Sequence, residues 1–127
     1  MYNKAFNQLE KGNYKKSLEI YDYLLSKNYE IFHVLTYLII LYDHFNDLDT
    51  LLNRVNELLL DSNYDYYILL FKKGNILYLQ NKYDDALECF NEVLENDPDN
   101  SGAKFYKKRI SEKRNKTKLK EIINDLE

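Results

Sequence analysis

The sequence predicts an all-α protein built from helical hairpins, and three observations support this fold class. The chain of 127 residues contains one proline and three glycines, too few for the many tight turns of a sheet protein. Apolar residues recur at spacings of three and four, as on the buried face of a helix. A pattern of two such helices joined by a short polar turn recurs along the chain. With 45% apolar and 31% charged residues, the chain is expected to be globular rather than disordered.

The hairpin with the clearest pattern covers residues 67–100. Residues 68–79 are apolar on more than one side, so this helix is expected to be buried on two faces. Residues 80–82 form a polar turn, and a second helix is expected to begin near Tyr83 and to end before Pro98, because proline cannot continue a helix. Its apolar face carries Ala86, Leu87, Phe90, Val93 and Leu94, and its polar face carries Asp84, Asp85, Glu88 and Glu92.

Gly74 lies inside the first helix of this hairpin, where glycine costs about 1 kcal/mol relative to alanine. The expected reason is that the missing side chain lets the second helix cross closely at Ala86. With Gly74 counted as the eighth position of a motif, Ala86 is the twentieth, Phe90 the twenty-fourth and Pro98 the thirty-second. On this spacing the stretch resembles a tetratricopeptide repeat, a helical hairpin of 34 residues. The resemblance implies tandem hairpins stacked in an α-α superhelix that binds other proteins.

The same pattern recurs twice before this hairpin, and the chain is expected to be a single domain. The predicted repeats cover about residues 1–31, 32–66 and 67–100, and a C-terminal helix covers about residues 101–126. In the first repeat, Ala5 and Ser17 take the small positions, whereas Ile39 and Leu51 take them in the middle repeat. These larger side chains are expected to separate the middle pair of helices or to change their crossing angle.

The C-terminal helix is expected to begin at a cap formed by Asn100 or Ser101 and to cover the last apolar face of the array. Residues 104–120 hold nine basic residues and one acidic residue, a net charge of +8, whereas residues 1–103 hold nine basic and seventeen acidic residues, a net charge of −8. The last turns carry an apolar stripe of Leu119, Ile122, Ile123 and Leu126. Such a stripe is expected to bury itself in the chain's own groove, on a second copy or on another protein.

In the tetratricopeptide family, fixed positions of the first helices line a concave groove. Carried onto this sequence, those positions are Tyr2, Phe6, Leu9, His33, Thr36, Ile40, His44, Ile68, Phe71, Asn75, Tyr78, Phe105 and Arg109. This lining implies a peptide or helix with apolar anchors as the ligand. Some of these side chains are expected only to fill gaps between helices. Family members that hold the tails of heat-shock chaperones use lysine and asparagine where this chain has Tyr2 and Phe6, so that ligand is not expected.

No catalytic residue, metal site or cofactor is expected. His33 and His44 lie eleven residues apart, about 16 Å along a helix, too far to hold one metal ion. Cys89 is the single cysteine, so no internal disulfide can form, and a reducing, cytoplasmic location is expected. The N-terminal residues do not begin a signal peptide, and the longest nearly apolar run, residues 34–42, is too short to cross a bilayer.

These observations predict a non-catalytic protein-interaction module whose partner is a peptide or helix of another protein. The alternative is self-assembly, possible as a homodimer, through the amphipathic C-terminal helix. Nucleic-acid binding by the basic helix is a weaker hypothesis, because no aromatic residue interleaves the basic stretch after Tyr106.

Overall fold

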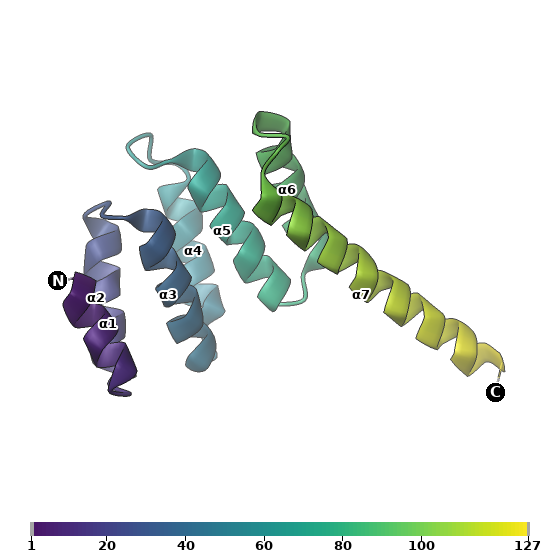
Figure 1. Ribbon diagram of the computed structural model, residues 1–127, viewed down its shortest axis with the longest axis horizontal. Helices are drawn as coiled ribbons and strands as arrows, with labels where there is room; N and C mark the ends of the chain where they lie inside the picture. The colour runs from purple at the N-terminus through teal and green to yellow at the C-terminus, as the bar shows by residue number, and fades with distance from the viewer. Residues whose placement is uncertain (1, 127) are drawn as a thin grey trace.

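The computed structural model describes residues 2–126, and this part of the chain folds into seven α-helices without strands (Figure 1). The helices are α1 (Tyr2–Glu10), α2 (Tyr14–Ser26), α3 (Ile31–His44), α4 (Leu48–Leu58), α5 (Tyr66–Leu79), α6 (Tyr83–Asn96) and α7 (Ser101–Leu126). The predicted fold of three helical hairpins followed by a C-terminal helix is confirmed.

Each hairpin packs on the next. α1 packs with α2, α3 with α4 and α5 with α6, and the second helix of each pair also contacts the first helix of the following pair. α3 packs directly against α5. Figure 1 shows α1, α3 and α5 nearer the viewer than α2 and α4. The surface formed by α1, α3, α5 and the first turns of α7 is called the first-helix face below.

The core forms two clusters that meet at α5. Leu69 and Ile76 belong to a cluster with side chains of α1 to α4, whereas Leu70 and Leu77 belong to a cluster with side chains of α6 and α7. α5 is therefore buried on two faces, as its apolar pattern predicts.

Residues in the left-handed conformation lie in the short turns between helices. Gly12 has φ 80°, and Asn28, Asn46 and Asn81 have φ 55°, 55° and 62°. Glycine and asparagine tolerate this region better than other residues, which lets a helix end and the chain reverse within a few residues.

Asp65 caps α5. Its side-chain Oδ1 accepts hydrogen bonds from the backbone N–H groups of Tyr67 at 3.0 Å and Ile68 at 3.1 Å. We expect Asp65→Ala to lower the free energy of unfolding by about 1 kcal/mol, because two N–H groups lose their acceptor. Urea denaturation followed by circular dichroism measures this loss. Asp43→Ala, at an exposed position in the last turn of α3, is the control, and an equal loss in both variants would contradict the capping role.

The space beside Gly74 is occupied by the side chain of Phe90, so a residue larger than glycine does not fit there. A Cβ atom added at Gly74 would lie 2.7 Å from Cε1 of Phe90, so the nearest contact is with this ring, which lies one turn after Ala86 in α6. Phe90 is fully buried and stacks on Tyr106, with ring centroids 5.1 Å apart. Gly74 therefore does permit a close approach of α6, as predicted, and the nearest side chain is that of Phe90.

The middle hairpin is looser than its neighbours. Ile39 and Leu51, at its two small positions, are both buried. α3 and α4 approach each other closely over a smaller part of their length than α1 and α2 or α5 and α6 do. This agrees with the expectation from two bulky residues at the crossing.

The first half of α7 covers α6. Ala103 and Ile110 are fully buried, and Oδ1 of Asn100 accepts a hydrogen bond from the backbone N–H of Ala103 at 2.9 Å. The sequence predicted either Asn100 or Ser101 as the N-terminal cap of α7, and the structure shows that Asn100 forms it. The guanidinium of Arg114 forms an ion pair with Asp84 of α6. The Asp84 side chain remains 93% exposed, so the predicted polar face of α6 stays open to solvent and this ion pair contributes little.

Candidate functional site

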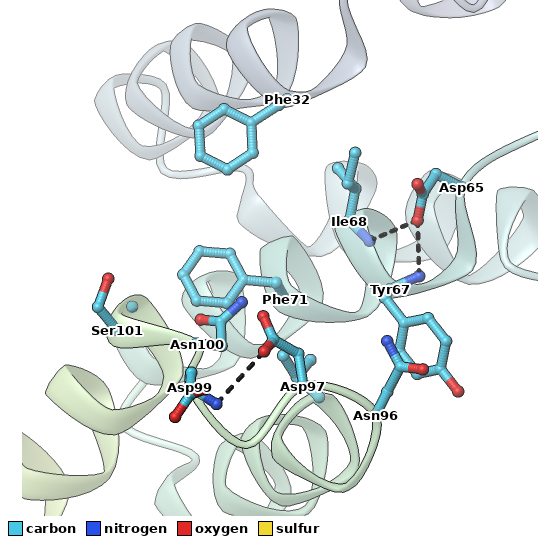
Figure 2. Close-up of a pocket in the computed structure, with 12 residues that line it drawn as sticks. Phe32, Asp65, Tyr67, Ile68, Phe71, Asn96, Asp97, Asp99, Asn100 and Ser101 are labelled. Carbon is cyan, nitrogen blue, oxygen red and sulfur yellow. Dashed lines mark hydrogen bonds between the residues drawn. The ribbon is translucent and has the colours of Figure 1, made fainter.

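A pocket of about 630 Å³ opens at the N-terminal ends of α5 and α7 (Figure 2). α3 contributes Phe32, the start of α5 contributes Asp65, Tyr67, Ile68 and Phe71, α6 contributes Val93 and Asn96, and the following turn and α7 contribute Asp97, Asp99, Asn100, Ser101 and Gly102. Ile68 and Phe71 are predicted binding residues, and the pocket brings them together. Phe32, which precedes the predicted positions of α3 by one residue, is an addition.

Phe71 forms a fixed apolar wall of this pocket. Its ring centroid lies 5.7 Å from that of Phe90 and 6.0 Å from that of Tyr106. Gly102 lies against the same ring, because an added Cβ would be 2.7 Å from Cζ of Phe71. The glycine therefore lets α7 begin close to α5. Figure 2 shows Phe32 on the opposite side of the pocket from Phe71.

The rim of the pocket is acidic. Asp65 caps α5 there, and Oδ1 of Asp97 accepts a hydrogen bond from the backbone N–H of Asp99 at 3.3 Å. Asp99 also lies 3.9 Å from Nζ of Lys104, but both side chains are largely exposed, so this ion pair contributes little. An apolar wall with carboxylates around it favours an apolar anchor flanked by basic groups.

Lys72 is the most unusual residue near the site. Its side chain is only 4% exposed, its Nζ donates a hydrogen bond to Oγ1 of Thr36 at 2.8 Å, and the same nitrogen lies 3.8 Å from the centroid of the Phe32 ring. Within residues 2–126 no carboxylate forms an ion pair with it. Burial lowers the pKa of the Lys72 ammonium to about 8. The ammonium thus links α3 to α5 directly behind Phe32.

Sequence reasoning missed the burial of Lys72, although a signal was present. Lys72 lies three residues after Leu69 and four before Ile76, and both of these residues are fully buried. The three share one helix face. A lysine at this spacing must be covered by the neighbouring hairpin.

The predicted residues of α1 lie around Tyr37 of α3. The ring of Tyr37 stacks on that of Tyr21 at 5.2 Å, and it meets the rings of Tyr2 at 6.4 Å and Phe6 at 5.8 Å. Leu9 packs, partly buried, on the same core. Tyr2 and Leu9 therefore mainly fill the space between hairpins, while Phe6 remains 38% exposed.

The predicted residues of α3 are spread along the whole helix. His33 is exposed, Thr36 accepts the lysine hydrogen bond, and Ile40 is 52% exposed. His44 lies at the far end of α3, where its ring is 4.5 Å from that of Tyr14 at the start of α2. The structure therefore separates His44 from the pocket by nearly the full length of the helix.

In a comparison with models of protein families, residues 67–100 match the tetratricopeptide repeat. These residues form α5, the turn, α6 and the loop that leads to α7. Residues 67–100 are a tetratricopeptide repeat. The comparison with curated proteins gives no match for this chain. A tetratricopeptide repeat indicates a protein-interaction module, and the pocket lies where this repeat meets α7.

The remaining predicted residues lie along the tetratricopeptide repeat and α7. The ring of Tyr78 is 5.2 Å from that of Tyr106, and Nζ of Lys113 lies 5.3 Å from the Tyr78 centroid, so Tyr78 mainly joins α5 to α7. Asn75 is half-buried, and its side-chain Oδ1 lacks a hydrogen-bond partner among the described residues. Phe105, 56% exposed, and Arg109 project from α7.

The tetratricopeptide repeat also contains the single cysteine. Cys89 is buried in α6, and burial raises the pKa of its thiol to about 11, so the thiol is protonated near neutral pH. In the described part of the chain, no three histidine, cysteine or carboxylate side chains lie close enough together to hold a metal ion. None of the helices between residues 2 and 126 combines the length and the apolar character needed to span a bilayer.

Proposed function

We propose that the first-helix face binds a peptide or short helix of another protein, and that the protein acts as a non-catalytic, cytoplasmic adaptor. The observation that carries this proposal is the open pocket between Phe32 of α3 and Phe71 of the tetratricopeptide repeat. Large apolar side chains that remain exposed beside an open pocket are typical of binding surfaces.

The proposed contact residues are the apolar predicted positions that remain accessible, together with Phe32. They are Phe32, Ile40, Ile68, Phe71 and Phe105, with Phe6 and His33 at the edge. An apolar anchor of the ligand would enter the pocket, and basic residues beside it would approach Asp65, Asp97 and Asp99. The predicted residues Tyr2 and Tyr78 are not proposed to contact the ligand, because they mainly fill space between helices. His44 is not proposed either, because it lies at the far end of α3 from the pocket.

The probe for this proposal is a fluorescein-labelled peptide selected from a displayed random library on the immobilised protein. We expect Ile40→Glu and Phe105→Glu each to weaken its binding by about tenfold or more, because both side chains are exposed on the proposed surface. Fluorescence anisotropy measures the affinity. Tyr23→Glu, at an exposed aromatic position on α2, is the matched control and should leave the affinity unchanged.

Two results would overturn the proposal. One is unchanged affinity in both first-helix variants, and the other is an equal loss in the Tyr23→Glu control. Phe71→Glu and Tyr78→Glu are unsuitable tests, because both rings pack in the cluster around Tyr106 and a charge there would unfold the repeat. Circular dichroism of each tested variant confirms that its helices are intact.

A further inference from the structure

The last twelve residues of α7 in the described chain, 115–126, have no packing partner and are called the α7 tail. All twelve are exposed. In Figure 1 this part of the helix extends beyond the other helices. Four large aliphatic side chains nevertheless follow one another at helical spacing in the tail: Leu119, Ile122, Ile123 and Leu126. An apolar stripe on an otherwise polar, solvent-exposed helix is a marker of an interaction surface.

The stripe lies on the opposite side of α7 from the face that covers α6. Ile110 is buried against α6, and Leu119 follows it by nine residues. Nine residues at 3.6 per turn make two and a half turns, so the two side chains point in opposite directions. The stripe is therefore not a continuation of the contact with α6. It also cannot fold back on the first-helix face of its own chain, because the helix continues unbroken to Leu126.

We propose that the stripe binds the same stripe of a second copy in an antiparallel pair of helices. A two-fold axis between Ile122 and Ile123 places Ile122 against Ile123 of the second copy. The same axis places Leu119 against Leu126 of the second copy. All four aliphatic side chains of each chain then meet an aliphatic partner, which is the self-complementarity that a symmetric dimer requires.

The charges beside the stripe favour this antiparallel arrangement. Lys118 and Asp125 are seven residues apart and lie on the same side of the stripe, at equivalent heptad positions. Antiparallel pairing brings Lys118 of each chain diagonally across from Asp125 of the other, offset by about 3 Å along the axis, so the contact forms twice. Parallel pairing would instead set two segments of residues 104–120, each with a net charge of +8, side by side. Repulsion between them disfavours that arrangement.

The paired segments are short, so the dimer is expected to be weak. The overlap covers only the last two to three turns of each helix, so the buried area is well below the roughly 1,200 Å² of a stable interface. We therefore expect a reversible dimer that forms between about 10 µM and 1 mM. Such a dimer would leave both first-helix faces open and would make the assembly bivalent for a peptide ligand.

Sedimentation equilibrium of the full chain over this concentration range tests the proposal. The mass should rise from monomer towards dimer for the wild type, and Ile122→Glu combined with Ile123→Glu should remain monomeric. Lys118→Asp should weaken the dimer roughly tenfold, because two attractive contacts become repulsive. Combining Lys118→Asp with Asp125→Lys should restore it. Leu60→Glu, at a 90% exposed position after α4, is the control and should behave as wild type.

Several outcomes would overturn the proposal. A wild-type monomer throughout the range would exclude the dimer, and a dimer that persists in the Ile122→Glu/Ile123→Glu variant would place the interface elsewhere. A dimer lost in Ile40→Glu or Phe105→Glu would show that the tail binds the first-helix face of the second copy. Failure of the charge exchange to restore the dimer would exclude the antiparallel register. Peptide binding measured at low micromolar concentration should be unchanged in the tail variants, so this test and that of the first-helix face fail independently.

Discussion

Gly74→Val is expected to lower the free energy of unfolding by about 3 kcal/mol. The first added carbon would lie 2.7 Å from Cε1 and 2.8 Å from Cζ of Phe90, well inside van der Waals contact. The ring cannot move aside easily, because it is fully buried and stacked on Tyr106 with an interplanar angle of 7°. Urea denaturation measures the loss, and Asn91→Val at an exposed position of α6 is the control for the lower helix propensity of valine.

A double-mutant cycle separates the contact with Phe90 from helix propensity. Gly74→Ala gains about 1 kcal/mol of helix propensity but is expected to lose more through its clash, so it should destabilise the wild type. In a Phe90→Leu background the ring edge is absent, and the same substitution should become stabilising. An effect of Gly74→Ala with the same sign and size in both backgrounds would contradict the role assigned to Phe90.

Local periodicity was sufficient to predict the hairpins. In the repeat at residues 67–100, apolar spacings of three and four, a polar turn and Pro98 together define the ends of α5 and α6 closely. These features depend on neighbours within one or two turns of the same chain segment. The resemblance to a tetratricopeptide repeat could be recognised from the sequence because all the motif residues lie within this one hairpin.

Contacts between hairpins were harder to predict. The register places Ala86 opposite Gly74, but the large ring of Phe90 reaches across the gap from the next turn of α6. Tyr37 is adjacent to predicted binding positions of α3 and turns towards Tyr21 and the side chains of α1. Which side of a first helix faces the groove depends on how consecutive hairpins are rotated, and a single sequence does not specify that rotation.

The sequence predicted the apolar stripe of the α7 tail but not its orientation relative to α6. Periodicity groups Leu119, Ile122 and Leu126 on one face. Only the buried position of Ile110 shows that this face points away from the body of the protein. The packing of α7 was therefore needed to exclude the chain's own groove as the partner of the stripe.

Lys72→Met is expected to raise the free energy of unfolding at pH 7 by about 2 kcal/mol, because it removes a buried charge that no carboxylate neutralises. The ordinary pKa of lysine is 10.5, and burial lowers that of Lys72 to about 8. Between these two values the unfolded chain binds more protons than the folded protein. The stability of the wild type should therefore rise as the pH increases from 8 towards 10.

The comparison of the two proteins at several pH values isolates this effect. Methionine does not titrate, so the advantage of Lys72→Met should be largest below pH 8 and should shrink as the pH approaches 10. Measurements stay below pH 10 because burial raises the pKa of Tyr42 to about 12, and its ionisation in the unfolded chain would then lower stability. Urea denaturation at pH 7.0, 8.5 and 9.5 provides the data. Lys15→Met, at an exposed position of α2, controls for the loss of one positive charge.

Two contacts of the Lys72 ammonium, the hydrogen bond to Thr36 and the contact with the Phe32 ring, oppose the stabilisation expected for Lys72→Met. Their loss in Lys72→Met costs about 1 kcal/mol each or less, which is smaller than the cost of keeping an unpaired ammonium buried. A pH-independent difference between the two proteins would mean that packing, and not charge, determines the effect. Destabilisation at pH 7 would mean that the contacts with Thr36 and Phe32 outweigh the burial of the charge. In that case Lys72 would hold α3 against α5 and fix Phe32 at the edge of the pocket.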